Sequence, residues 1–219
     1  MRLRNNPKAN EILENHKEFV VLNTKKYKGR WKDVFSNNNP IYIEIGMGKG
    51  DFIIENASRY PHINFIGIEK FPSVLVGAVK KYDEVGQLDN LKFMKEDAIF
   101  LNEVFEDNEV DCIYLNFSDP WPKKKHAKRR LTSHTFLPVY EKILKKQGEL
   151  ILKTDNRTLF EFSLISFQQF GMNFQDVCLD LHHSDGYEDN IQTEYERKFS
   201  PYGPIYRIVT TFKGENKNG

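Results

Sequence analysis

The chain has only two cysteines, Cys112 and Cys178, and both lie in apolar stretches. This excludes a disulfide framework and predicts buried free thiols in a reducing compartment. No apolar run is long enough to cross a membrane, and no hydrophobic stretch follows the first charges as in a signal peptide. The histidines are scattered, and His182-His183 has no partner at ligand spacing. We therefore expect a soluble, cytoplasmic protein without a metal.

Positive charge is in excess only in one stretch of the chain. Over all 219 residues, 32 basic and 31 acidic side chains nearly balance. This balance argues against a protein that coats nucleic acid over its whole surface. Six of the eight residues in Lys123–Arg130 are Lys or Arg, and the rest of the chain has 26 basic against 31 acidic residues, a net −5. Such a focused patch is typical of a site that holds a polyanion, although many charge runs are only solvated.

The chain divides near residue 40. Residues 1–39 are polar and basic, with one amphipathic stretch around Ala9–Val21, and are expected to form an arm or cap outside the main sheet. Asn37–Pro40 interrupts the chain. Residues 40–219 are expected to form the main domain, and no internal repeat or low-complexity tract is present.

From residue 41 onward, short apolar segments alternate with segments of helical periodicity. The predicted strands and helices are Ile41–Ile45, Asp51–Arg59, Asn64–Ile68, Ser73–Tyr82, Leu91–Met94, Ile99–Phe105, Val110–Asn116, Ser133–Lys145, Glu149–Lys153 and Leu159–Phe170, in strand–helix order. Ser133 is the expected N-cap of its helix. Phe174–Leu181 and Tyr206–Phe212 have no good helix between them and are expected to pair as antiparallel strands. The alternation predicts an α/β fold with a mostly parallel sheet and helices on both faces.

The first strand leads into a glycine-rich loop, Gly46-Met47-Gly48-Lys49-Gly50, which opens a helix. Alternating glycines let a ligand approach the backbone. A dinucleotide fingerprint has glycine where this chain has Asp51, and both Glu44 and Asp51 disfavour a pyrophosphate at the helix N-terminus. These carboxylates favour a cationic nucleoside, S-adenosyl-methionine, while an ordinary tight turn is the alternative.

Two further acidic residues end the second and third strands. Glu69 follows the glycine loop by roughly twenty residues, the spacing at which an acid meets the ribose hydroxyls. Asp97 is expected to accept from the adenine amino group, with the Ala98 amide donating to the ring. Each carboxylate alone is typical of a solvated strand end. Glu44, Glu69 and Asp97 together, at the ends of three successive strands, favour a nucleoside site.

The fourth strand leads into the corner Phe117-Ser118-Asp119-Pro120-Trp121-Pro122, where two prolines restrict the backbone. Methyltransferases that act on adenine amino groups often carry Asn/Asp-Pro-Pro-Tyr here, an imperfect match because Trp121 replaces the second proline. Asp119 is expected to face both the methyl donor and the acceptor. Trp121 is expected to pin the loop, with stacking on a base as the alternative.

Three segments, Asn116–Lys124, Lys153–Asn156 and Thr193–Glu196, resemble the tRNA (guanine-N7)-methyltransferase family, and the resemblance extends from about Arg2 to Phe212. It implies a Rossmann-like class I methyltransferase domain over residues 40–219, with a seven-stranded sheet. It also implies methyl transfer from S-adenosyl-methionine to guanine N7 in the variable loop of tRNA. The cofactor site is then lined by Glu44, Gly46, Gly48, Glu69, Asp97, Ala98 and Asp119, the last also being catalytic.

The same resemblance assigns the substrate to the basic loop and to the two later segments. The residues implied are Lys123, Lys125, His126, Lys128, Arg129, Arg130, Asp155, Thr193, Glu194, Tyr195 and Glu196. Guanine N7 carries a lone pair and no proton, so carboxylates are needed for orientation and electrostatic support, not as a base. Asp119, Asp155 or Glu196 is expected to accept from guanine N1–H and the 2-amino group. An N-cap role for Asp155 is a compatible alternative, and both a monomer and a homodimer remain open.

Three other classes of protein compete with this interpretation. A methyl- or aminopropyltransferase for small molecules would leave the six clustered cations without a role. A non-catalytic RNA-binding protein would not need Glu44, Glu69 and Asp97. A nicotinamide-dependent oxidoreductase is disfavoured by Asp51 in the glycine loop.

Overall fold

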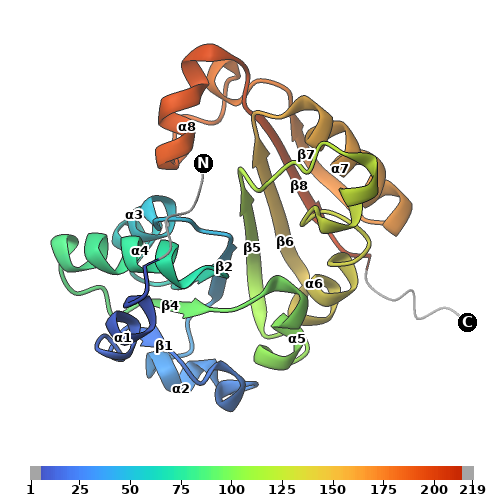
Figure 1. Ribbon diagram of the computed structural model, residues 1–219. Coiled ribbons are helices and arrows are strands. Elements are labelled where there is room, and N and C mark those ends of the chain that lie inside the picture. Colours follow the sequence, from blue (N-terminus) through green and yellow to red (C-terminus); the bar gives the residue numbers. More distant parts are fainter. Residues whose placement is uncertain (1–5, 214–219) are drawn as a thin grey trace, which may run out of the picture.

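The computed structural model describes residues 6–213, in which one twisted sheet lies between two layers of helices (Figure 1). The eight strands have the order β1-β4-β3-β2-β5-β6-β8-β7. Their bounds are β1 Val20–Val21, β2 Ile41–Ile45, β3 Asn64–Glu69, β4 Leu91–Lys95, β5 Val110–Asn116, β6 Leu144–Thr154, β7 Asn173–Cys178 and β8 Tyr206–Thr211. All described neighbours pair in parallel except β8, which is antiparallel to β6 and β7. The predicted α/β fold is confirmed.

The helices cover both faces of the sheet because successive strand residues point to opposite sides. They are α1 Ala9–Glu14, α2 Trp31–Phe35, α3 Asp51–Arg59, α4 Pro72–Val85, α5 Leu101–Val104, α6 Leu137–Ile143, α7 Arg157–Phe170 and α8 Glu194–Phe199. Ile41, Ile43 and Ile45 belong to a core shared with α2, α5, α6 and α7. A second core joins α1, α3 and α4 to the other face of β3 and β4.

The N-terminal segment differs from the expectation in one respect. Val20 and Val21 form β1, which pairs in parallel with Phe93 and Met94 of β4, so this part of residues 1–39 lies in the sheet. Both valines are buried. The two residues extend the sheet from the seven expected strands to eight, because the edge of β4 offers unpaired backbone groups.

The prediction that Ser133 is the N-cap of helix α6 is wrong. Helix α6 begins at Leu137, with Phe136 at the N-cap position. Pro138 has no backbone N–H and fits only the first turn of a helix, so α6 does not extend back to Ser133. The Ser133 hydroxyl instead donates to the Lys128 carbonyl at 3.0 Å and closes the preceding loop.

A helix also lies where none was expected, between β7 and β8. Thr193 and Glu196 form a capping box that starts α8, each side chain accepting from the other residue's N–H. The spacing Thr-x-x-Glu is the sequence signal for such a start. The expected antiparallel pairing of the flanking segments is confirmed by β7 and β8.

The carboxyl ends of the parallel strands lie together along one side of the sheet, which we call the carboxyl edge. The strand order reverses between β2 and β5, the position at which open α/β sheets bind ligands. We call residues 179–205, which connect β7 to β8, the strap. In Figure 1 the strap carries α8 to the same end of the molecule as α3. Glu194 of the strap pairs with Lys49 in the loop after β2 and with Lys81 of α4, and Tyr195 donates to Asp155 directly after β6.

Candidate active site

The glycine loop lies flat against the carboxyl end of β3. The N–H groups of Gly46 and Met47 donate to the Ile68 carbonyl at 2.9 and 3.1 Å. Gly46 and Gly48 have φ of 75° and 61°, in the left-handed region that favours glycine. A Cβ at either position would meet nothing within 4 Å, so the backbone faces open space that a ligand can enter.

Glu44 is buried beneath this loop at the end of β2. Only 2% of the residue is exposed, and Oε1 accepts from Asn116 Nδ2 at 2.9 Å. Three buried polar atoms at the ends of β2 and β5 have no partner within residues 6–213, namely Glu44 Oε2, Asn116 Oδ1 and Ser118 Oγ. Buried acceptors without partners are costly. They fit a ligand that brings N–H donors or positive charge, as the methionine part of S-adenosyl-methionine does.

Burial also changes the acidity of Glu44. Loss of hydration raises the pKa of this carboxyl group to about 8, against the opposing effects of the Asn116 hydrogen bond and the Lys153 charge. Without a cation, Glu44 is therefore largely protonated at neutral pH. A bound cation is expected to stabilise the ionised form.

Glu69 connects the end of β3 to the glycine loop. Its Oε2 accepts from the Gly48 N–H at 3.2 Å and its Oε1 from the Phe71 N–H at 2.9 Å. Burial raises the pKa of Glu69, and these backbone donors oppose the shift. A carboxylate has about four lone-pair positions, so two remain for ribose hydroxyls.

Asp97 follows β4 and begins the short helical turn that contains Ala98. One carboxylate oxygen accepts from the Ile99 N–H at 3.3 Å, and the other pairs with Lys70 Nζ at 2.6 Å. The side chain is 28% exposed and follows β4, which is the neighbour of β3 in the sheet. Lys70 is a partner that the sequence patterns did not indicate.

The corner after β5 holds two aromatic residues in left-handed backbone conformations. Phe117 has φ 50° and Trp121 has φ 41°, values that are uncommon for bulky residues and are held by their surroundings. Between them, Asp119 is exposed. Its charge contributes to the raised pKa of Glu69, after the larger effect of burial.

The basic loop, Lys123–Arg130, contains a 3₁₀ segment, Lys124–Arg129, in which no residue is buried. The exposed members are Lys123, Lys124, Lys125, Lys128 and Arg129, and within residues 6–213 none of them pairs with a carboxylate. The Trp121 ring packs within the loop, 4.9 Å from the Arg129 guanidinium and 5.7 Å from the His126 ring. These contacts fit the expected pinning role of Trp121.

Arg130 differs from the other cations of this run. It is buried, with 6% exposed, and its guanidinium donates to the carbonyls of Pro120 and Trp121 at 2.9 and 3.1 Å. It also lies over the Phe162 ring. Two of its donors are thus used to hold the corner, and the expected contact of Arg130 with substrate stays a prediction.

Asp155 and Tyr195 meet across the gap between β6 and the strap. The Tyr195 hydroxyl donates to Asp155 Oδ2 at 3.0 Å, and both residues are exposed. The Tyr195 ring packs 5.1 Å from Phe117. The N-cap of α7 is Asn156, whose Oδ1 accepts from the Leu159 N–H, so the alternative N-cap role of Asp155 is wrong.

The remaining strap residues divide into an exposed and a buried set. Glu194 pairs with Lys49 and Lys81, which ties α8 to the glycine loop and α4. Thr193 is engaged as the cap of α8. Glu196 is fully buried, which the sequence-based assignment to guanine did not anticipate.

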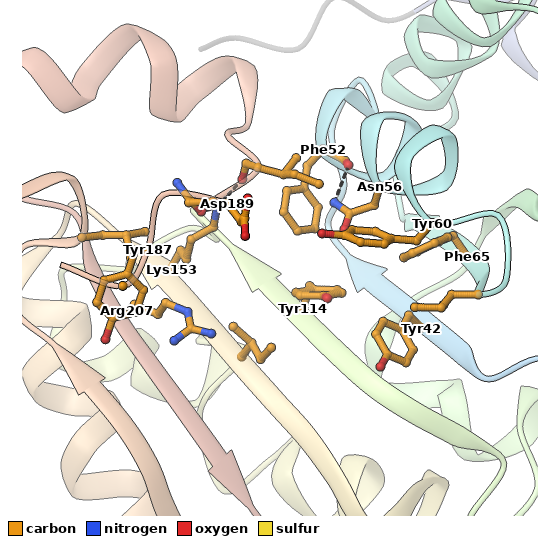
Figure 2. Close-up of a pocket in the computed structure, with 16 residues that line it drawn as sticks. Tyr42, Phe52, Asn56, Tyr60, Phe65, Tyr114, Lys153, Tyr187, Asp189 and Arg207 are labelled. Atoms are coloured by element: carbon orange, nitrogen blue, oxygen red, sulfur yellow. Dashed lines mark hydrogen bonds between the residues drawn. The ribbon is translucent and has the colours of Figure 1, made fainter. Parts of the chain in front are cut away.

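An aromatic cavity of about 340 Å³ lies between α3 and the strap (Figure 2). Tyr42, Phe52, Tyr60 and Tyr114 are among its walls. None of the carboxylates assigned to the cofactor lines it. Lys153, near the end of β6, also lines the cavity.

The described residues contain no helix that could cross a membrane and no group of three metal-ligating side chains.

Solved structures with the same arrangement are methyltransferases. A 16S rRNA (adenine(1408)-N(1))-methyltransferase from Catenulisporales acidiphilia, solved with S-adenosyl-methionine, superposes with a TM-score of 0.63 at 13% identity, covering 87% of this chain and 93% of its own. An antibiotic-related methyltransferase gives 0.62 at 19% identity, covering 84% and 93%. A family of putative methyltransferases matches residues 38–207. The fold and the family model together define a Rossmann-like methyltransferase.

Curated relatives narrow this class. The tRNA (guanine-N(7)-)-methyltransferase of Listeria innocua is 54% identical over 213 residues, which is 97% of this chain and 99% of the relative. That of Oceanobacillus iheyensis is 52% identical over 214 residues, 97% of this chain and 100% of the relative. The chain belongs to the tRNA (guanine-N(7)-)-methyltransferase family.

Three residues that organise the site were given no role by the sequence patterns. Asn116 orients Glu44, Phe117 supports Tyr195, and Lys153 binds the strap. Of these, Lys153 had a usable signal, because it is a charged residue at the end of the apolar run Leu150-Ile151-Leu152. A charge in a buried strand requires a partner.

Proposed function

We propose that the protein transfers a methyl group from S-adenosyl-methionine to N7 of a guanine in the variable loop of tRNA. The observation that carries this proposal is the 54% identity, over nearly the whole of both chains, to a tRNA (guanine-N(7)-)-methyltransferase. The acidic edge and the basic loop supply the two binding functions that such an enzyme needs. A tRNA substrate also favours a cytoplasmic location.

On the cofactor side, Glu44 and Asn116 would receive the cationic methionine part beside Gly46 and Gly48. Glu69 would accept from the ribose hydroxyls, and Asp97 with Ala98 would meet the adenine. The bound cofactor supplies an electrophilic methyl group on a sulfonium. All of these residues lie in 40–219, which supports this range as the methyltransferase domain.

The N-terminal segment would act as a cap on this domain. The Thr24 hydroxyl donates to Glu96 at 3.1 Å, next to Asp97, and the Asn6 N–H donates to Ser73 Oγ at 2.9 Å. Residues of the segment thus lie against the side of the edge assigned to adenine.

On the acceptor side, Asp119 would face the methyl donor while Asp155 orients the base. Guanine N1–H and the 2-amino group are both donors, so a carboxylate there discriminates guanine from adenine. Because N7 has no proton to lose, catalysis depends on alignment and on carboxylate charge near the cationic product. Thr193, Glu194 and Tyr195 would complete the wall formed by α8.

The basic loop would hold the phosphates on either side of the target. Lys123, Lys125, His126, Lys128 and Arg129 share its outer surface. Phosphate contacts of this kind place the RNA without reading its sequence, so base choice stays with the carboxylates.

The raised pKa of Glu44 predicts a pH-dependent affinity for the cofactor. Below pH 8 the carboxyl group is mostly neutral, and its ionised fraction rises with pH. If the cation binds the ionised form, Kd falls about 20-fold between pH 6 and pH 7.5 and levels off above pH 8. Isothermal titration calorimetry measures this. The Glu44→Gln variant should lack this dependence, and a flat profile in the wild-type protein would remove Glu44 from the cation site.

The proposal is tested by methylating a tRNA transcript and a matched transcript whose variable-loop guanine is replaced by adenine. Label from S-adenosyl-methionine should enter the first and be nearly absent from the second. Equal labelling of both would refute the assigned position. Labelling of neither, with cofactor binding intact, would favour a different acceptor.

A further inference from the structure

The ammonium group of Lys153 lies buried at the end of β6 and is used entirely by the strap. Only 2% of the residue is exposed. Its Nζ donates to Glu196 Oε2 at 2.6 Å, the Ile191 carbonyl at 2.8 Å and Asn190 Oδ1 at 3.1 Å. An ammonium has three N–H donors, and all three acceptors come from the strap. Lys153 therefore fixes the strap to the central sheet.

The carboxylate of Glu196 is equally occupied. Oε1 accepts from Asn190 Nδ2 at 2.7 Å and contacts His182 Nε2 at 3.0 Å. Oε2 accepts from Lys153 Nζ and from the Thr193 N–H at 3.4 Å. These four contacts fill about all the lone-pair positions that a carboxylate offers. A guanine could bind Glu196 only if one of these contacts broke.

The residues next to Glu196 reach the acceptor side instead. Tyr195 donates to Asp155 and packs on Phe117 of the strained corner. On the far side of α8, Glu194 and Arg197 pair with the region of α3 and α4 through Lys49 and Asp51. These outer pairs are half exposed and weakly stabilising. The buried pair is thus the main constraint on where Tyr195 lies.

We propose that Lys153 and Glu196 are positioning residues, whose buried ion pair latches the strap to β6 and sets Tyr195 and Asp155 for guanine, while neither touches the base. This inference rests on the proposed function for the identity of the acceptor. The latch itself is a property of the fold.

The design of the test follows from the energetics of buried ion pairs. Removing one partner leaves an uncompensated buried charge, whereas replacing both by neutral groups of similar shape is often tolerated. Lys153→Met and Glu196→Gln are such replacements, alone and combined. Lys145→Met is the matched control, because Lys145 lies in the same strand but is half exposed and pairs with Asp111 at the other end.

Two quantities are measured for each variant: hydrogen exchange of the amides in residues 186–199, and kcat and KM for tRNA methylation. Each single variant should exchange at least tenfold faster in this segment and lose about 30-fold in kcat. Cofactor Kd should stay within about fivefold of wild type. The double variant should recover protection and return kcat to within about fivefold of wild type. Lys145→Met should match the wild-type protein in hydrogen exchange and in the kinetics of tRNA methylation.

The opposite results would overturn the latch. If Glu196 bound guanine, the double variant would stay as slow as Glu196→Gln even with its strap protected. Unchanged exchange in both single variants would also contradict it. If a single variant does not fold, the neutral double variant decides, since a folded double with a loss of more than 100-fold in kcat refutes the proposal. A wild-type protein that forms no 7-methylguanosine refutes the proposed function, while exchange still tests the latch.

Discussion

The Asp155→Ala variant is expected to methylate tRNA with a kcat/KM about 10³-fold below that of the wild-type enzyme. Asp155 is exposed at the end of β6, where the Tyr195 hydroxyl holds one of its oxygens. Loss of the carboxylate would leave guanine N1–H and the 2-amino group without an acceptor. When a substrate's hydrogen-bonding groups lose their partners in a site, kcat/KM falls by several orders of magnitude. Steady-state kinetics with a tRNA transcript measures the loss.

Cofactor binding separates this effect from general damage. Asp155 contacts none of Glu44, Glu69 and Asp97 in the structure, so the Kd for S-adenosyl-methionine should stay within about twofold. Asp107→Ala is a matched control, because Asp107 is half exposed shortly before the amino end of β5 and, among residues 6–213, forms an ion pair only with Lys142. Turnover by Asp155→Ala equal to that of Asp107→Ala would exclude Asp155 from the acceptor site.

Affinity for tRNA is expected to fall by about 10²- to 10³-fold between 50 and 200 mM salt. Five exposed cations of the basic loop have no carboxylate partner within residues 6–213, so they are available to displace counterions from phosphates. Four to five such contacts give a fall of this size. Filter binding or fluorescence anisotropy over a salt series measures the slope.

The slope also assigns the individual contacts. Lys125→Ala and Lys128→Ala should each reduce it by about one unit, since each removes one phosphate contact. Lys145→Ala, at the amino end of β6, should leave it unchanged. A salt-independent affinity would mean that the loop does not bind the backbone of the RNA.

The carboxylate edge could be predicted because its geometry follows from strand periodicity. Ile41–Ile45, Val110–Asn116 and Asp51–Arg59 have the bounds expected from their apolar patterns. Parallel strands place their carboxyl ends together, so acids that follow successive strands meet at one edge. The positions of Glu44 and Glu69 beneath the glycine loop are the result.

Side-chain direction could not be predicted in the same way. A run of six cations in eight residues does not show that Arg130 turns inward to bind two carbonyls while its neighbours face solvent. The burial of Glu196 depends on Lys153, which lies 43 residues earlier in the chain. Strand β1 has two residues, too few for any periodicity, and exists because β4 offers an edge.

The assignment of guanine N7 as the methyl acceptor is tested most directly by identifying the nucleoside that receives the methyl group. Unmodified tRNA is incubated with the wild-type protein and labelled S-adenosyl-methionine, digested to nucleosides and separated by chromatography. The label is expected in 7-methylguanosine. Label in another nucleoside would contradict the assignment of guanine N7, even if the cofactor site proved correct.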